Sequence, residues 1–188
     1  MITQIMEINY EEDTRLHGAS AIMNVYNPNA EAMQFTDAEI SINDQSDFPS
    51  NFIVAGWTDR NTKNWWFDIS QTKDESHNIH IGYWPGSILS SLGNGADSVS
   101  WAGYAKAGHD GVGPPMGNGL FPEDQKSCYM KYLKFVDDNY ILRNSLNRTN
   151  VNVRVDSKKC YDLLYHADYT PNEGNSFRFG GPGGGKCD

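Results

Sequence analysis

The chain has no long apolar segment, because charged and polar residues recur along all 188 positions. None of its apolar runs approaches the roughly 20 residues that a membrane-spanning helix needs. Glu7 interrupts the short apolar stretch near the N-terminus, and no basic residues precede it. We therefore expect neither a membrane segment nor a signal peptide in this sequence.

Basic residues are also few. The chain has 15 Lys and Arg against 24 Asp and Glu, which gives a formal net charge of −9. Surfaces that bind nucleic acids need clustered Lys and Arg, whereas the basic residues here are scattered. We therefore expect no nucleic-acid partner, and the acidic balance is typical of a soluble protein.

Cysteine is scarce as well, with only Cys128, Cys160 and Cys187. An odd number of thiols cannot pair completely within one chain. The spacing alone does not say which two would pair, and in a reducing compartment all three would stay thiols.

What the sequence does contain is short alternating segments rich in glycine and aromatic residues. Period-two alternation, typical of half-buried strands, recurs five times. The segments centre on residues 21–25, 38–42, 79–83, 151–155 and 177–179. Only residues 87–92 have the apolar spacing of a helical turn. The pattern predicts one all-β domain, an antiparallel sandwich or barrel.

The central part of the chain carries an ordered series of aromatic and glycine motifs. They occupy residues 51–57, 64–66, 82–85, 101–104 and 116–119, followed by Phe121-Pro122. In this order they resemble the neprosin family, plant glutamic peptidases that cut beside proline. The resemblance implies an antiparallel β-sandwich and a proline-containing peptide or protein as substrate or ligand, without metal or cofactor.

The resemblance extends to both ends of the chain. Motifs at residues 17–19, 24–28 and 34–36 match the family's opening, and those at 160–162 and 179–183 with Cys187 match its close. We therefore divide the chain into an N-terminal lead-in, residues 1–15, and a neprosin-like domain, residues 16–188. The resemblance also implies a disulfide between Cys160 and Cys187, and a secreted protein.

One part of the family pattern is absent. The family has a long segment with several strands after the string that ends here at Trp57, whereas this chain continues directly to residues 64–66. The sandwich is therefore shortened in the middle. Because missing strands expose sheet edges, we expect that the domain could associate with itself through an edge strand.

The family's catalytic glutamates are replaced. Their two positions in the matching motifs hold Val54 and Tyr104. Peptide hydrolysis by two carboxyl groups needs one to take a proton from water and the other to donate one. Valine can do neither, and a tyrosine hydroxyl is a poor base at acid or neutral pH. We therefore predict an inactive or impaired enzyme, unless Glu39, Asp59 or Glu123 compensates.

The aromatic residues have two interpretations. They pack a small core, or some of them line a groove that stacks on proline rings or sugars. The second interpretation predicts a non-catalytic module that binds Pro-rich peptides or glycans; a third possibility is a non-functional truncated product. The groove candidates are Trp57, Trp66, Tyr83, Trp84 and Trp101. Alternation separates Trp65 from Trp66, so one of these two belongs to the core.

Three other motifs carry little chemistry. His77 and His80 would point to opposite faces of a strand, so we expect no metal site. Residues 180–186 are similar to a phosphate-binding loop, but no helix can follow before the chain ends, and a closing turn fits better. Asn147 begins a glycosylation sequon that matters only in the secretory pathway.

Overall fold

The structure is a computed structural model that describes residues 2–9, 15–44, 52–54, 56–70, 79–89, 91–144, 151–170, 173–185 and 187. Every strand pairing in these ranges is antiparallel, and no α-helix occurs in them. They also contain no helix of the length and apolar character needed to cross a bilayer. The all-β antiparallel sandwich predicted from the sequence is therefore confirmed.

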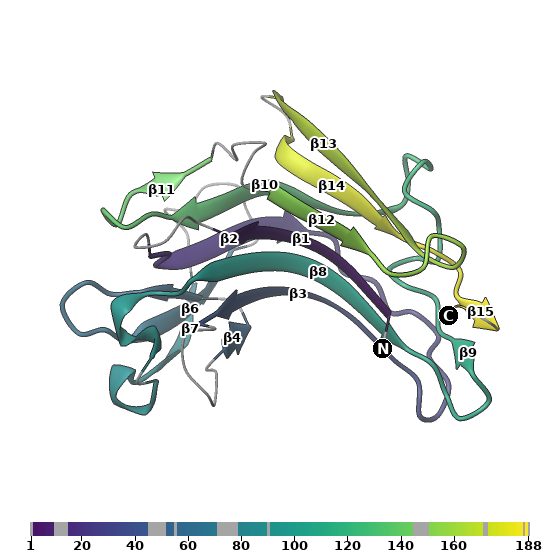
Figure 1. Ribbon diagram of the computed structural model, residues 1–188, viewed down its shortest axis with the longest axis horizontal. Coiled ribbons are helices and arrows are strands. Elements are labelled where there is room, and N and C mark those ends of the chain that lie inside the picture. Colours follow the sequence, from purple (N-terminus) through teal and green to yellow (C-terminus); the bar gives the residue numbers. More distant parts are fainter. Residues whose placement is uncertain are drawn as a thin grey trace.

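Two curved sheets form the body of the molecule (Figure 1). The five-stranded sheet has the order β12-β1-β8-β3-β4, and the eight-stranded sheet the order β13-β14-β10-β2-β5-β6-β7, with β11 paired to β10. A small third sheet pairs β15 with β9. The strands are β1 (Ile2–Asn9), β2 (Gly18–Met23), β3 (Phe35–Asn43), β4 (Phe52–Val54), β5 (Gly56–Thr58), β6 (Trp65–Ile69), β7 (Ile79–Trp84), β8 (Ser98–Lys106), β9 (Val112–Gly113), β10 (Cys128–Val136), β11 (Leu142–Arg143), β12 (Val151–Val155), β13 (Asp162–Thr170), β14 (Gly174–Gly180) and β15 (Gly184–Gly185).

The N-terminal segment belongs to the domain. Residues 2–9, which we assigned to a lead-in, form β1 between β12 and β8 in the five-stranded sheet. The assignment is corrected because the backbone of these residues pairs on both sides. The alternation in 2–9 is broken at Gln4 and Ile5, where the expected apolar and polar residues are exchanged, and this concealed the strand in the sequence.

The core lies between the two large sheets. The five-stranded sheet contributes Ile40, Ile42, Val99 and Trp101, and the eight-stranded sheet contributes Trp65, Met130, Phe135, Phe177 and Phe179. These side chains recur at every second position because successive residues of a strand face opposite sides of a sheet. The other face of β3 and β8 is consequently polar.

A bulge in β10 changes which positions face the core. Cys128 and Met130 are buried before it, and Leu133 and Phe135 after it, so the alternation shifts by one residue. Tyr132 has a φ of 52° at this point, a left-handed conformation that non-glycine residues rarely adopt. Its backbone N–H donates to the Glu173 carbonyl at 2.8 Å, so the bulge anchors the turn between β13 and β14.

Two segments agree only in part with the structure that their sequence patterns predict. Residues 87–92, expected to form a helical turn, lie across two short 3₁₀ turns, Gly86–Ile88 and Leu92–Asn94. The alternation at 79–83 correctly predicts β7, but Ile79, Ile81 and Tyr83 are each more than half exposed because β7 is the last strand of its sheet.

Candidate functional site

The two family glutamate positions lie on strands that flank β3. Tyr104, on β8, is opposite Asp37 of β3, and position 54, on β4, is opposite Ser41 of β3. Residues directly opposite each other in an antiparallel pair share a face, and their Cβ atoms are about 5 Å apart. Both positions therefore belong to the face of the five-stranded sheet that is turned away from the core.

Glu39 lies between these two positions. It is two residues from Ser41 and two from Asp37, so it is the diagonal neighbour of position 54 on one side and of Tyr104 on the other. Diagonal neighbours across a strand pair are about 7–8 Å apart. The β3 residues opposite the two family positions, Asp37 and Ser41, are four residues apart. Glu39 lies midway between them, so it is the acid of β3 that is closest to both positions.

Asp37 and Glu39 form a pair of half-buried carboxyl groups on this face. Burial raises the pKa of Asp37, and a hydrogen bond from the backbone N–H of Tyr104 partly opposes the change. Burial also raises the pKa of Glu39, and the negative charge of Asp37 raises it further. One Asp37 oxygen, Oδ1, is buried without a hydrogen-bond partner among the described residues.

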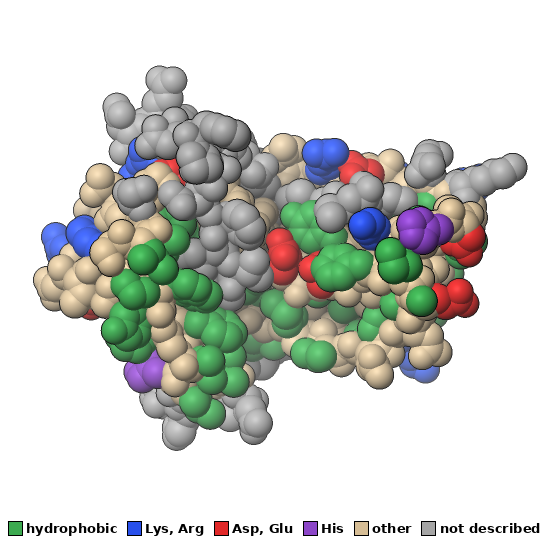
Figure 2. Space-filling view, turned by 90° about the horizontal axis from the view of Figure 1, so that it is seen from below, with side chains coloured by type: hydrophobic (Ala, Val, Ile, Leu, Met, Phe, Trp, Pro, Cys, Tyr) green, Lys and Arg blue, Asp and Glu red, His purple; other side chains and the backbone are tan. Residues whose placement is uncertain are grey.

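Serine side chains continue the polar face beyond the two acids. Ser41 and Ser100 share a hydrogen bond of 2.8 Å between their hydroxyl oxygens, and Asn43 Nδ2 donates to Ser41 at 3.3 Å. Ser98 is fully buried. Acidic side chains are visible in the middle of this side of the molecule in Figure 2.

The other two candidate acids have different surroundings. The carboxylate of Asp59 accepts hydrogen bonds from the backbone N–H groups of Asn61 and Thr62 and from the Thr62 hydroxyl. The bonds from Thr62 are the main reason that its pKa is lowered. Asp59 thus stabilises the turn between β5 and β6. Glu123 is exposed in the loop before β10. Of the three acids predicted to compensate, only Glu39 lies beside the family positions.

The aromatic residues divide between core and surface. Trp65 and Trp101 are completely buried, and Trp101 donates its indole N–H to the Ser20 carbonyl at 3.3 Å. Trp101 is therefore a core residue, which corrects its assignment to the groove. Trp84 packs against the core from a partly buried position.

Trp66 and Tyr83 remain as an accessible aromatic pair. They are opposite each other on β6 and β7, with ring centroids 4.9 Å apart, and Tyr83 is 52% exposed. His80 contacts Trp66 edge-on and lies 2.7 Å from an Asp68 carboxylate oxygen. The backbone of Trp57, in β5, is opposite Gly18 of β2 and Trp66 of β6. Its side chain is not among those that the structure describes.

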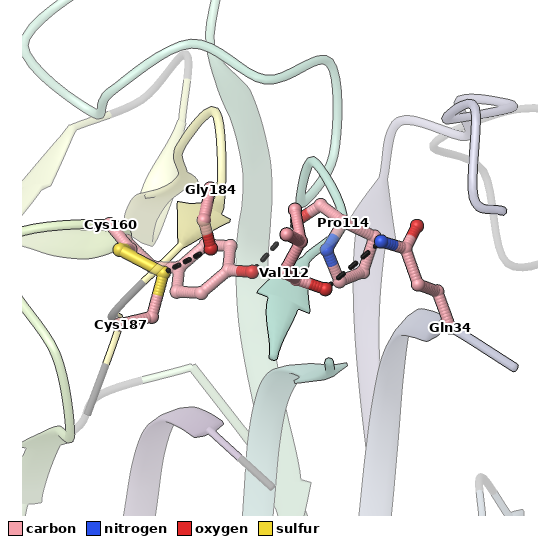
Figure 3. The surroundings of a disulfide bond; sticks show 7 residues. Gln34, Val112, Pro114, Cys160, Gly184 and Cys187 are labelled. Atoms are coloured by element: carbon pink, nitrogen blue, oxygen red, sulfur yellow. Dashed lines mark hydrogen bonds between the residues drawn. A yellow bond between two sulfur atoms is a disulfide. The ribbon is translucent and has the colours of Figure 1, made fainter. Parts of the chain in front are cut away.

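The C-terminal segment is fastened to the rest of the domain (Figure 3). Cys160 and Cys187 form a disulfide, and the buried Tyr161 donates its hydroxyl to the Pro114 carbonyl at 2.8 Å. Burial raises the pKa of Tyr161 to about 12. Nearby, Gln34 Nε2 donates to the Val112 carbonyl at 3.0 Å. We call Gly113, Pro114, Cys160, Tyr161, Gly183 and Cys187 the C-terminal clasp.

The remaining sequence candidates are a thiol, a histidine pair and a glycosylation sequon. Cys128 is a buried free thiol 3.2 Å from Asn24 Oδ1, and burial raises its pKa to about 12. No cluster of three or more His, Cys, Asp or Glu suited to a metal lies in the described ranges. His77 and Asn147 lie outside those ranges.

Sequence reasoning missed one cluster, which forms around a buried histidine. His17 is 4% exposed and stacks on Tyr140, with ring centroids 3.9 Å apart. Lys63 donates to the Tyr140 hydroxyl at 3.2 Å, so the cluster joins β2, the turn before β6 and the loop after β10. No spacing pattern signals these contacts, because the three residues are far apart in the sequence.

One comparison with known proteins bears on this site. The family model described as Neprosin matches residues 32–182, which include β3, β4 and β8 with both family positions. The match covers well over half of the chain.

Proposed function

Because the chain belongs to the neprosin family, we propose that it is a peptidase-domain protein whose family catalytic activity is lost or impaired. The observation that supports this proposal is the pair of residues at the family glutamate positions, Val54 and Tyr104. Without those acids, no carboxyl group stands at either position to take a proton from water or donate one to the scissile carbonyl.

A second route to hydrolysis is favoured by the position of Glu39. It is the diagonal neighbour of both family positions and lies on the same strand as Asp37. Two neighbouring carboxyl groups with raised pKa values can hold one proton between them at acid pH. One group is then a base toward water and the other an acid toward the carbonyl oxygen. Any residual cleavage would run through this pair.

Cleavage of a proline-containing peptide from pH 2 to 7 tests both statements, with folding of each sample verified by calorimetry. We expect the wild-type chain to show little or no cleavage, and Glu39→Gln or Asp37→Asn to reduce any residual rate at least about tenfold. Glu123→Gln is the matched control, because Glu123 is exposed in a loop. A turnover of roughly 1 s⁻¹ or more would contradict the impaired activity. Residual cleavage unchanged in both variants would contradict the Asp37–Glu39 route.

Restoring the family acids is the complementary experiment. The double variant Val54→Glu with Tyr104→Glu places a carboxyl on each side of Glu39. Recovered cleavage in the folded double variant would show that the replacements alone abolish activity. A folded but inactive double variant would show that the loss of those acids is not the only defect.

A binding role is the alternative that the exposed aromatic pair supports. Trp66 and Tyr83 present adjacent rings at the surface, the arrangement on which proline rings or sugars stack. Tryptophan fluorescence titrated with Pro-rich peptides and with oligosaccharides tests it. A saturable shift that Tyr83→Ala removes supports binding at this pair, and no shift with either ligand class contradicts it.

A further inference from the structure

In the described part of the chain, four strands end the main orders of the two large sheets, and the two-residue β11 lies off this order beside β10. Three of the four end strands are short or charged. β4 is only three residues long. β12 carries the charged Arg154 at its exposed surface, and β13 contains Asp162 and Asp168. Short edges and charged residues are the devices by which proteins prevent edge-to-edge association.

β7 is neither short nor charged, and its one irregularity is a β-bulge at Ile81, the residue that its register with β6 skips. Its sequence, Ile-His-Ile-Gly-Tyr-Trp, contains no Lys, Arg, Asp, Glu or Pro. Among the described strands it pairs only with β6. Ile79 and Ile81 are each 54% exposed, and hydrophobic side chains gather over this end of the molecule in Figure 2. A strand of this kind presents unpaired backbone groups together with apolar side chains.

Charge also distinguishes this edge. Two copies of a chain with a net charge of −9 repel each other at most surfaces. On β7 the only ionisable residue apart from its tyrosine is His80, and its ring lies 2.7 Å from the Asp68 carboxylate of β6. The Asp68 carboxylate is thus already hydrogen-bonded to His80, and β7 itself brings no carboxylate to face a second β7.

We propose that β7 is the self-association surface of this protein, where a second copy pairs antiparallel with the same strand. A two-fold axis near Ile81 brings Ile79 of one copy opposite Tyr83 of the other, so the surface is complementary to itself. The eight-stranded sheet then continues from one copy into the next through β6 and β7. This proposal stands apart from the catalytic one, since it uses no residue of β3 or β8.

Sedimentation of the full chain over a wide concentration range tests the pairing. We expect the mass to rise from 21.1 kDa toward twice that value as the concentration increases. Ile81→Lys should raise the dissociation constant at least about tenfold, because it places two like charges beside the two-fold axis. Val153→Lys is the matched control on β12, where Val153 is 41% exposed. Cooperative thermal unfolding verifies that both variants fold.

Amide hydrogen exchange supplies a second measurement that does not depend on substitution. The pairing predicts that protection of residues 79–84 increases with protein concentration while that of residues 151–155 does not. A wild-type chain that stays at 21.1 kDa throughout, or a dimer that Val153→Lys disrupts as strongly as Ile81→Lys, overturns the proposal. Binding of an extended peptide to β7 of a strictly monomeric chain would also overturn it, in favour of a peptide as the occupant.

Discussion

The C-terminal clasp and the β7 edge lie at opposite ends of the molecule, near β9 and β15 and near β6 and β7 respectively (Figure 1). In the clasp, residues 113–114, 160–161 and 183 approach one another closely, and a disulfide joins Cys160 to Cys187. At the edge, three large side chains of one strand are more than half exposed. The comparison shows that close backbone contacts fix the C-terminal segment, whereas the eight-stranded sheet ends in an exposed strand, β7.

The glycines show the difference most directly. Gly183 has a φ of 72°, and a Cβ on it would overlap the carbonyl oxygens of Gly113 and Pro114. Gly82, in β7, has no positive φ, and a Cβ on it would meet nothing within 4 Å. The same residue type is thus required by the backbone at one end and permitted by open space at the other.

The largest expected effect comes from testing these two glycines with the same substitution. Gly183→Ala should lower the free energy of unfolding by about 2–4 kcal/mol, from the strained φ and the displaced carbonyl groups. Gly82→Ala should change it by less than about 1 kcal/mol. Urea denaturation measures both, provided that the slope with denaturant is unchanged. Equal effects of the two substitutions would remove the contrast between clasp and edge.

Much of the fold was predictable because alternation depends only on local sequence. It indicated the strands at β3, β7, β12 and β14, and the ordered motifs indicated the family. The position of Glu39 between the two family positions was not predictable, because it depends on how β4 and β8 register against β3. Registers between strands distant in sequence are set by packing of the whole sheet, which no single segment encodes.

The exposure of aromatic residues was equally beyond the sequence. Trp66 and Trp101 both lie in strands, but only Trp101 is fully buried. Trp65, next to Trp66 in β6, is completely buried, so the difference arises from the face of the strand: Trp66 lies on the face of β6 opposite to Trp65. Alternation separates the two faces of a strand, but it does not say which face meets the core.

A substitution at one tyrosine in the clasp and one in β7 should have effects of intermediate size on the free energy of unfolding. Tyr161→Phe removes the only hydroxyl seen to donate to the Pro114 carbonyl among the described residues, and leaves that buried oxygen unsatisfied. We expect a loss of about 1–2 kcal/mol in the free energy of unfolding. Tyr83→Phe, at the exposed edge, should cost less than about 0.5 kcal/mol. Thermal melts of the two variants side by side provide the measurement, and a larger loss for Tyr83→Phe would reverse the expected order.

The smallest effect concerns pH, and it distinguishes the clasp from the cluster of His17, Tyr140 and Lys63 by their titrating groups. Burial lowers the pKa of His17 from 6.5, with Asp138 opposing the change and Lys63 adding to it. Because the folded state then binds the proton less readily than the unfolded state, the stability from neutral His17 is complete above pH 6.5 and is lost as the pH falls below it. The clasp contains no comparable group, since the pKa of Tyr161 lies at about 12.

We therefore expect acidification from pH 7 to 5 to increase hydrogen exchange, corrected for intrinsic rates, at residues 18–23 and 140–143 more than at residues 160–163. His17→Phe retains a ring to stack on Tyr140 and should remove the pH dependence at the first two segments. A His17 pKa above 6.5, measured from its ring signals by NMR, would instead show that Asp138, 3.9 Å from His17 Nε2, outweighs burial. In that case acidification would stabilise the His17 cluster, and hydrogen exchange at residues 18–23 and 140–143 would decrease instead of increasing.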